Sequence, residues 1–494
     1  MNQARPAVAR TTNVPVQRGP AGAEAAPPRH PTATERAARG LAARKVLPPG
    51  EHSQLVRPVA RSSPVAVLLA QATTRVPDLV PVRHARMVAS PFSFFRGAAA
   101  LMARDLAAAP TTDLTVQLCG DAHLSNFGVF GTPERRLIFD INDFDETLPG
   151  PWEWDVKRLA ASIAVAGREN GLDDRARRRA VRAAVDRYQQ AMARLATMRE
   201  LDVWYYRVDV DELVEILRKQ FSKQRGKQLD RNVAKARRND SLRAFGKLTE
   251  VVDGRRRIKA DPPLLVPIGD LLPGVARHRL ESEIKGLLTS YSESLLPDRR
   301  LLLSKFRFVD MARKVVGVGS VGTRCWIVLL EGRDANDPLF LQVKEAQESV
   351  LAPHVPRSEQ QGRPTNQGER VVAGQRVMQA ASDTFLGWDR ATGIDGAQRD
   401  FYFRQLRDQK GSAVVETMGP KTLRVYGELC GGTLARAHAR SGDAIAIAAY
   451  LGDDTAFSKA VADFAEKYAD LNERDHAEVV EAVRAGRLPA DPAR

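Results

Sequence analysis

The chain has 494 residues, of which 43% are hydrophobic and 27% are charged, so it is long enough for two or three domains with a substantial core. No apolar run is long enough to span a membrane, and the N-terminus lacks the apolar segment of a secretory signal. Three widely spaced cysteines without a Cys-x-x-Cys pair argue against a zinc site or a disulfide framework. This cysteine usage suits a reducing compartment, and we therefore predict a cytoplasmic protein.

The net charge of +15 also restricts the possible partners. A basic surface favours contact with nucleic acid, anionic membranes or phosphorylated ligands. Aromatic residues are not interleaved among the basic ones, which does not favour nucleic acid. Residues 218–259 are dense in Lys and Arg, and they form either a solvated helix with a basic loop or a contact surface for an anionic partner.

The apolar periodicity divides the chain into a tail, a mixed segment, a strand-rich segment and a helical end. Residues 1–50 are rich in Ala, Pro, Arg and Thr without a periodic apolar pattern, which predicts a disordered tail. Runs of β-forming residues bounded by turn residues predict strands, and amphipathic stretches predict helices. Strands are predicted at 114–118, 136–139, 314–317, 325–330, 339–344, near 385 and at 401–406, and helices at 98–108, from about 155, at 173–199, 366–380, 422–440 and 444–468.

A polar loop after the first predicted strand carries residues suited to phosphoryl transfer. This reaction needs a group that accepts a proton from the attacking hydroxyl, and ligands for the metal that neutralises phosphate charge. In Gly120-Asp-Ala-His-Leu-Ser-Asn126, the residues Asp121 and Asn126 have the D-x-x-x-x-N spacing of kinase catalytic loops. We therefore assign Asp121 as the base and Asn126 as a Mg²⁺ ligand, with an ordinary polar turn as the alternative.

An acidic cluster follows the second predicted strand. Asp140, Asp143 and Asp145 are separated by apolar or polar residues, so their carboxylates could project to one face. Three neighbouring like charges repel each other without a cation. Mg²⁺ prefers oxygen ligands and usually takes one or two carboxylates together with phosphate oxygens. We rank Asp143 first as a metal ligand, then Asp140 and then Asp145.

A glycine-rich segment lies much later in the chain. Gly317, Gly319 and Gly322 fit the pattern G-x-G-x-x-G, which by itself also marks dinucleotide-binding folds. A dinucleotide fingerprint joins a strand to a helix, whereas here the β-forming run 325–330 follows the glycines. A hairpin that covers phosphates is the kinase arrangement, in which Ser320 and the backbone amides would contact the nucleotide. The alternative is a plain glycine-rich turn.

Lys344 ends the apolar run 339–344, where a lysine is costly to bury unless it is paired. In a kinase, such a lysine holds the α- and β-phosphates and pairs with a glutamate from the next helix. Glu369 is the best candidate for that partner, and Glu345 and Glu348 are alternatives. An exposed lysine at the end of a strand is the other interpretation of Lys344.

Further polar residues have two possible roles each. Asp155 would either bond the backbone of the catalytic loop or cap its own helix. Arg83, Arg86 and Arg96 would either bind an anionic acceptor or form structural contacts. His123 is predicted to orient the loop by hydrogen bonding and is not assigned as the base.

The catalytic motifs resemble those of the aminoglycoside and choline phosphotransferases, a branch of the kinase superfamily. That resemblance rests on Gly120-Asp-Ala-His-Leu-Ser-Asn126, Ile141-Asn-Asp-Phe-Asp145 and Trp154-Asp155. The branch usually has a histidine directly before the loop, where this chain has Cys119. From about Arg83 to Ala485 the chain also resembles the bacterial family called domain of unknown function 2252, which brings no established substrate. This second resemblance rests on Arg83…Arg86-Met87, Phe94-Phe95-Arg96-Gly97, Gly120-Asp-Ala-His…Asn-Phe-Gly128, Asp143-Phe-Asp-Glu146 and Trp154-Asp…Lys157-Arg158-Leu159.

The kinase resemblance implies an α+β fold with the two lobes of a protein kinase. Because the glycine-rich segment and Lys344 come after the catalytic loop, the order of the lobes is predicted to be circularly permuted. The predicted divisions are a tail at 1–50, a helical catalytic lobe at 51–304, a β-rich nucleotide lobe at 305–408 and a helical segment at 409–494 that returns to the catalytic lobe.

The function expected from these motifs is ATP- and Mg²⁺-dependent phosphoryl transfer to a hydroxyl of an unidentified small molecule or protein. One alternative is a nucleotidyl transferase that uses the same residues with the nucleotide reversed. The other is a non-catalytic pseudokinase, or anion-binding scaffold, that uses the basic segment 218–259.

Overall fold

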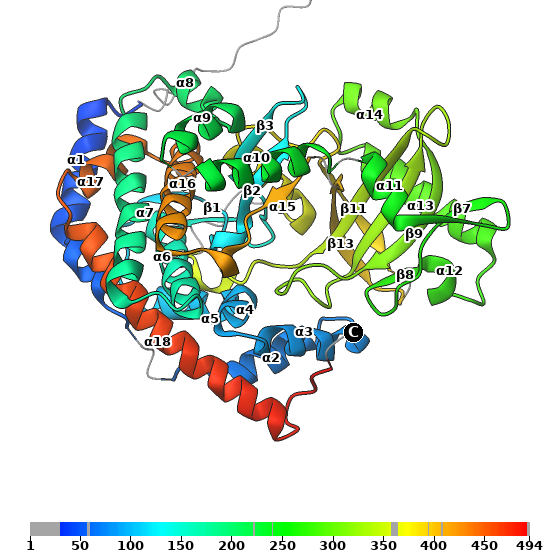
Figure 1. Ribbon diagram of the computed structural model, residues 1–494, viewed down its shortest axis with the longest axis horizontal. Coiled ribbons are helices and arrows are strands. Elements are labelled where there is room, and N and C mark those ends of the chain that lie inside the picture. Colours follow the sequence, from blue (N-terminus) through cyan, green and yellow to red (C-terminus); the bar gives the residue numbers. More distant parts are fainter. Residues whose placement is uncertain are drawn as a thin grey trace, which may run out of the picture.

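The computed structural model describes residues 30–56, 60–220, 223–239, 241–356, 364–393, 395–406 and 409–491. The fold is α+β with antiparallel sheets, which confirms the predicted class. Figure 1 shows a helical region on the left and a sheet region on the right. None of the described helices is long and apolar enough to cross a membrane. The main helices of the helical region are α6 (Trp152–Glu169), α7 (Asp174–Leu195), α16 (Pro420–Ala439), α17 (Ala444–Leu451) and α18 (Ala456–Arg484).

The helical region is assembled from both ends of the chain. Helix α16 packs along α7, and α18 packs against α6 and α7. The contact between α16 and α7 is close at Gly431, where an added Cβ would collide with the carbonyl oxygen of Ala184. Near the C-terminus, the Asp491 N–H donates to the Pro81 carbonyl at 3.1 Å. The segment after residue 409 therefore packs against the first part of the chain.

The predicted disordered tail is too long. Helix α1 (Ala33–Val46) begins after Thr32, whose side chain accepts from the Glu35 N–H while the Glu35 carboxylate accepts from the Thr32 N–H. This capping box satisfies the first amides of the helix. Helix α1 then packs on α17, where Gly40 lies against the backbone of Ala446. A small-residue contact of this kind produces little apolar periodicity, so the pattern missed the helix. The rest of the predicted tail, residues 1–29, lies outside the described residues.

The sheet region is built on six antiparallel strands in the order β12-β13-β11-β10-β9-β8. Strands β9, β10 and β11 form an antiparallel meander, in which Cys325 pairs with Lys344 and Trp326 with Arg313. The strands predicted at 325–330 and 339–344 correspond to β10 and β11, whereas the run predicted at 314–317 lies mostly in the loop after β9, which ends at Lys314. The six strands are β8 (Leu265–Pro267), β9 (Arg307–Lys314), β10 (Cys325–Glu331), β11 (Pro338–Ala346), β12 (Gly387–Thr392) and β13 (Gln398–Gln405).

Both faces of this sheet are covered by helices, so its central strand β10 is apolar on both sides. Val328 belongs to a core that includes Tyr291 of α13 (Arg277–Ser292), and Ile327 belongs to a core that includes Leu248 of α11 (Ser241–Leu248). Tyr291 also stacks on Phe403 at a centroid distance of 4.0 Å. The sheet region therefore begins well before the predicted boundary at residue 305, because the helices that cover the sheet precede it in the chain.

Two smaller sheets carry the loops of interest. Strand β1 (Thr115–Leu118) pairs with β4 (Leu148–Pro151), and β3 (Leu137–Ile141) pairs with β2 (Phe127–Gly131) and β5 (Val208–Asp209). The turn after β1 leads to β2 and the turn after β3 leads to β4, so both turns connect the β1–β4 pair to the β2–β3 pair. Leu118 pairs with Leu148 and Phe127 pairs with Ile141, and this pairing brings the two polar turns together.

The other elements connect these parts, and the described part of the basic segment 218–259 folds mainly as α10, α11 and the hairpin β6–β7. They are α2 (Pro64–Ala72), α3 (Val80–Val88), α4 (Pro91–Gly97), α5 (Ala99–Ala107), α8 (Glu200–Tyr205), α9 (Val210–Gln220), α10 (Lys223–Arg237), β6 (Thr249–Val252), β7 (Arg255–Ile258), α12 (Ile268–Leu271), α14 (Pro297–Leu303), α15 (Gln367–Met378) and β14 (Gly411–Ser412).

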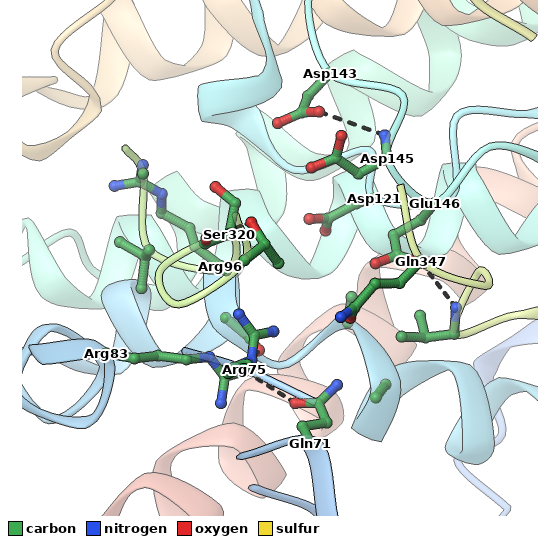
Figure 2. Close-up of a pocket in the computed structure, with 18 of the residues that line it drawn as sticks. Gln71, Arg75, Arg83, Arg96, Asp121, Asp143, Asp145, Glu146, Ser320 and Gln347 are labelled. Atoms are coloured by element: carbon green, nitrogen blue, oxygen red, sulfur yellow. Dashed lines mark hydrogen bonds between the residues drawn. The ribbon is translucent and has the colours of Figure 1, made fainter. Parts of the chain in front are cut away.

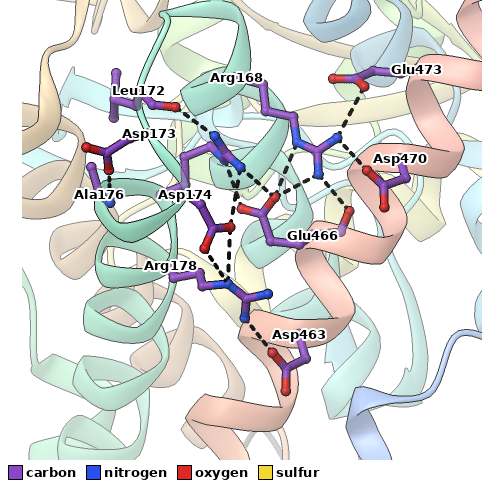
Figure 3. A network of polar contacts seen from close by, with 11 residues as sticks. Arg168, Leu172, Asp173, Asp174, Ala176, Arg178, Asp463, Glu466, Asp470 and Glu473 are labelled. Carbon is purple, nitrogen blue, oxygen red and sulfur yellow. Dashed lines mark hydrogen bonds and ion pairs between the residues drawn. The ribbon is translucent and has the colours of Figure 1, made fainter.

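A network of charged side chains holds α18 to α6 and α7 (Figure 3). The Glu466 carboxylate accepts hydrogen bonds from Arg168 on α6 at 2.7 Å and from Arg177 on α7 at 3.0 Å. The Glu466 side chain is only 8% exposed, whereas that of Asp470, which also pairs with Arg168, is 59% exposed. A buried carboxylate that bonds two arginines stabilises the packing far more than an exposed one, because solvent screens its hydrogen bonds and charge less.

Replacing Glu466 is therefore expected to destabilise the helical region. The variant Glu466→Ala should lower the free energy of unfolding by about 3–5 kcal/mol. The matched control Asp470→Ala should lower it by about 1 kcal/mol or less. Urea unfolding followed by far-ultraviolet circular dichroism measures both. Equal effects of the two variants would show that burial of Glu466 does not set its contribution.

Candidate functional site

A cavity of about 160 Å³ lies between the sheet region and the helical region. Its wall combines the loop after β1, the turn after β3, the glycine-rich loop between β9 and β10, and the helices α2 to α5. Figure 2 shows Asp143 and Asp145 at one end of the cavity and Arg75 and Arg83 at the other. Of the residues predicted from the sequence, the wall includes Asp121, Asn126, Asp143, Asp145, Gly317, Gly319 and Ser320.

The loop after β1 is held by Asp155 near the start of α6. The Cys119 N–H donates to Asp155 Oδ2 at 2.8 Å, and the Gly120 N–H donates to Oδ1 at 3.0 Å. His438 of α16 approaches the same carboxylate, with Nε2 3.3 Å from Oδ2. Gly120 has a φ of 82°, and a Cβ there would collide with Glu146, so the turn requires glycine. Of the two roles predicted for Asp155, the structure supports the bond to the loop backbone.

Asp121 faces the cavity and is held by Arg158. The Arg158 Nε and Nη2 atoms lie 2.8 and 2.7 Å from Asp121 Oδ1. The Asn126 side-chain amide donates to the Asp121 carbonyl oxygen at 2.8 Å, which closes the loop. Burial raises the pKa of Asp121 above its ordinary value, although the charge of Arg158 opposes this. His123 Nε2 lies 3.6 Å from Asp121 Oδ2, and burial keeps the pKa of His123 well below its usual range, so the ring is neutral.

The carboxylates after β3 meet Lys344 of β11 at the base of the cavity. Lys344 Nζ lies 2.5 Å from Asp145 Oδ2 and 3.9 Å from Asp143 Oδ1. The Tyr402 hydroxyl of β13 donates to Asp145 Oδ1 at 2.7 Å. Lys344 is 2% exposed, so it lies behind the acidic side chains and does not form part of the cavity wall. The structure thus joins Lys344 to two residues that lie far from it in the sequence.

The pKa values of these groups depend on one another. Burial alone would lower the pKa of Lys344, but Asp143 and Asp145 hold it well above its ordinary value. Burial would raise the pKa of Asp145, but Lys344 and the Tyr402 hydroxyl hold it below its ordinary value. Burial and the neighbouring charge of Asp145 raise the pKa of Asp143. Asp143 and Asp145 thus share the charge of Lys344, and the lysine makes its closer contact with Asp145.

The predicted partner of Lys344, Glu369, does not hold the lysine. Lys344 pairs with Asp145 instead, and the first turn of α15 directs Arg370 toward the turn after β3. Arg370 donates to the carbonyl oxygens of Asp145 at 2.9 Å and Thr147 at 2.7 Å. Helix α15 thus contributes to the site by holding the backbone of the acidic turn, which local sequence does not reveal.

Asp140 is also directed away from the cavity. It forms an ion pair with Arg436 of α16, and both side chains are 1% exposed. Its Oδ2 accepts from the Ala380 N–H at 2.9 Å. Asp140 lies within β3, whereas the chain turns before Asp143, so the two carboxylates do not share a face. The structure therefore corrects the assignment of Asp140 as a possible metal ligand and gives it a structural role.

The glycine-rich loop joins two antiparallel strands, as predicted, and lies against the helical region. Gly317 and Gly322 have φ angles of 69° and 89°, which other residues rarely adopt. The Gly317 carbonyl accepts from Arg86 Nη1 at 2.7 Å, and the Gly322 carbonyl accepts from the Val76 N–H at 2.8 Å. Ser320 reaches the cavity wall while its hydroxyl donates to the Val316 carbonyl oxygen at 3.1 Å. Gly322 does not itself line the cavity.

Several residues of the site have no role in the motifs read from the sequence. Arg75 and Glu146 line the cavity, and Arg158 holds Asp121. Burial, with smaller contributions from Asp145 and Asp121, raises the pKa of Glu146 to about 7. Glu146 and Arg158 stand inside motifs that carry the family resemblance, so their positions were visible in the sequence although their roles were not.

The oxygen atoms that line the cavity could hold a metal ion only if a bound ligand supplied further oxygen atoms to the same ion. Among the described residues, no group of three or more His, Cys, Asp or Glu side chains is arranged to hold a metal ion. Mg²⁺ in nucleotide sites usually takes one or two carboxylates and completes its shell with phosphate oxygens and water. Asn126, Asp143 and Asp145 all line the cavity, and their oxygen atoms suit that incomplete shell.

The chain belongs to a family described as "Uncharacterized protein conserved in bacteria (DUF2252)", whose model matches residues 75–482. The match includes the loop after β1, the acidic turn, the glycine-rich loop and Lys344. No curated protein and no solved structure matches the chain.

The raised pKa of Glu146 predicts a pH-dependent effect of its replacement. The usual pKa of 4.5 rises to about 7 in the folded chain, so the ionised carboxylate destabilises the fold. This destabilisation is absent below the unfolded pKa, grows between the two values and is complete above about pH 7. Glu146→Gln, which can still accept the Val350 N–H, should therefore gain about 2–3 kcal/mol of stability over wild type between about pH 5 and pH 8.

Urea unfolding of Glu146→Gln and wild type across this pH range measures the effect. Glu134→Gln, which replaces an exposed glutamate in the turn between β2 and β3, is the control and should show no comparable pH-dependent gain. A stability difference between Glu146→Gln and wild type that stays constant with pH would contradict the expectation.

Proposed function

We propose that the protein is an ATP- and Mg²⁺-dependent phosphotransferase that acts on a hydroxyl group. The observation that carries the proposal is the convergence of two distant segments on one cavity. The glycine-rich loop of the sheet region and Asp121, Asn126 and Asp143 of the other region line the cavity, and Lys344 of the sheet region lies behind the acidic side chains, 3.9 Å from Asp143. Phosphoryl transfer needs all of these groups around one nucleotide.

The order of elements in the sheet region supports this proposal. In a kinase, the glycine-rich loop precedes the lysine of the third strand, and a helix follows that strand. Here the loop lies between β9 and β10, Lys344 lies on β11, and α15 follows. If the elements are taken from β9 through α16 to the C-terminus, and only then from the start of the chain to β1, the sheet region comes before the catalytic loop. This is the order of the two lobes in a kinase. The C-terminus packs near Pro81, so a circular permutation is compatible with this packing.

Each residue has a role in the proposed reaction. Asp121 would accept the proton of the acceptor hydroxyl as its oxygen bonds to the γ-phosphorus of ATP and the bond to the ADP oxygen breaks. The raised pKa of Asp121 makes it a stronger proton acceptor, and Arg158 fixes its orientation. Asn126 and Asp143 would hold Mg²⁺, which would neutralise phosphate charge when bound. Lys344 would release Asp145 and bind phosphate oxygens of the nucleotide.

The size of the cavity implies that the two regions separate to admit a nucleotide. Ligand clefts usually have volumes of about 300–1,000 Å³, whereas this cavity measures about 160 Å³. The contacts that would have to loosen join the glycine-rich loop to the helical region, such as that between Arg86 and Gly317. We therefore regard the present arrangement as the closed form of the proposed enzyme.

Loss of Lys344 is expected to weaken nucleotide binding. Lys344→Met should reduce the affinity for ATP in the presence of Mg²⁺ by about 10–100-fold, since hydrogen bonds to charged groups contribute about 1.5–3 kcal/mol. Asp143→Asn should reduce the affinity only when Mg²⁺ is present. Isothermal titration calorimetry measures both, and Lys305→Met, at an exposed lysine of the same region, is the matched control. Unchanged ATP binding by the folded Lys344 and Asp143 variants would refute the proposal.

Loss of Asp121 is expected to act on turnover instead. Asp121→Asn should leave the affinity for ATP within about threefold of wild type and lower the rate of transfer by about 10²–10⁴-fold, the usual contribution of a general base. The rate follows from the transfer of label from ATP to acceptors in a cell extract, with product mass as the second readout. A product that gains AMP instead of phosphate would identify a nucleotidyl transferase, and ATP binding without any turnover would identify a pseudokinase.

A further inference from the structure

The arginine side chains of the cavity have no part in the reaction proposed above. Arg75 lies directly after α2, Arg83 on α3 and Arg96 on α4, and all three line the cavity. Figure 2 shows Arg83 extending toward Arg75 with Gln71 beside them, on the side of Asp121 opposite to Asp143. Three cationic side chains from separate elements therefore line the same cavity, with Arg75 and Arg83 adjacent at the end away from Asp143 and with Arg96 near enough for its charge to act on Asp121.

The hydrogen-bonding capacity of these arginines is only partly used. Arg83 Nη2 donates to Gln71 Oε1 at 2.9 Å and to the Gly97 carbonyl at 3.2 Å, which fixes the guanidinium group. Arg75 Nη1 donates to the Val321 carbonyl at 2.5 Å. Four buried nitrogens remain without a hydrogen-bond partner among the described residues, namely Arg75 Nε, Arg83 Nε, Arg83 Nη1 and Arg96 Nε. Buried donors of this kind normally have partners, so their absence points to a ligand.

The charge at this end is compensated only in part, since no ion pair is formed by Arg75 or Arg83 among the described residues. Arg83 is 1% exposed and Arg75 is 9% exposed. Burial lowers the pKa of Arg83 well below its ordinary value, and the neighbouring charge of Arg75 lowers it further. Carboxylates act on Arg75 only from a distance, and burial lowers its pKa to about 10. Two adjacent buried cations of this kind are costly unless an anion lies between or beside them.

The number and charge of the donors favour a phosphate group. A carboxylate offers two oxygens and one negative charge, whereas a phosphate monoester offers three terminal oxygens and a charge near −2. Arginine forks match phosphate oxygens in planar, paired hydrogen bonds. Unpaired nitrogens on three guanidinium groups therefore suit a phosphate better than a carboxylate.

We propose that Arg75, Arg83 and Arg96 form a binding site for a phosphate dianion, and that the phosphate belongs to the acceptor. The acceptor class is then a hydroxyl compound that already carries a phosphate monoester. Its hydroxyl would face Asp121, since Arg96 is close enough for its charge to act on that carboxylate. The assignment to an acceptor rests on the proposed phosphotransferase function, whereas the anion site itself does not.

Binding of inorganic phosphate to the full chain tests the site directly. Isothermal titration calorimetry should show phosphate binding to wild type that weakens by about tenfold or more in Arg83→Gln and in Arg96→Gln. Arg96 is only partly buried, so its variant keeps the test valid if Arg83→Gln fails to fold. The matched control Arg104→Gln, at an exposed arginine on α5, should bind phosphate as wild type does.

A second titration distinguishes the two sources of phosphate. With ATP and Mg²⁺ at saturation, inorganic phosphate should still bind with an unchanged dissociation constant, because the acceptor site and the nucleotide site are separate. Loss of phosphate binding under these conditions would assign the arginines to the nucleotide and overturn the acceptor assignment. No phosphate binding to wild type, or binding unaffected by both arginine variants, would overturn the anion site. Arginine-dependent phosphate binding without ATP binding would retain the anion site and refute the phosphotransferase proposal.

Discussion

The ion pair between Lys344 and Asp145 is the contact on which the cavity depends. It joins β11 of the sheet region to the acidic turn after β3, and the lysine is almost completely buried. A buried ammonium group is strongly destabilising unless a counter-charge lies beside it, and two neighbouring carboxylates repel each other unless a cation lies between them. The buried lysine therefore needs the carboxylates, and the carboxylates need the lysine. This ion pair brings the sheet region against the acidic turn.

The remaining contacts of the cavity hold backbone in place around that pair. Asp155 accepts from two amides of the loop after β1, and Arg370 donates to carbonyls of the acidic turn. The loops are thus held by charged groups on helices, which leaves Asp121 and Asp143 directed toward the cavity. The result is a cavity with carboxylates at one end and arginines at the other, so that a cation and an anion would each be bound at a different end.

Much of the site could be predicted because its parts are local in sequence. The glycine-rich loop was expected to join two strands, because the run from Cys325 to Leu330 is apolar without a helical period, and β10 is indeed buried on both faces. The partner of Lys344 could not be predicted, because the orientation of α15 decides whether Glu369 or Arg370 faces the acidic turn. The role of Asp140 likewise depended on Arg436, nearly three hundred residues away. Helix α1 was missed because its contact with α17 uses small side chains.

The sequence by itself determined which chemical groups are present, in which loops they stand, and most of the longer strands and helices, since these follow from side-chain type and short-range periodicity. The tertiary structure alone decided which charges meet, which carboxylate faces the cavity and where the sheet region begins. Pairings of this kind depend on how separate helices and strands pack, and burial makes a pairing between distant residues as strong as one between neighbours. The placement of three arginines with unpaired nitrogens on one cavity belongs to this second group, because no local pattern relates Arg75, Arg83 and Arg96.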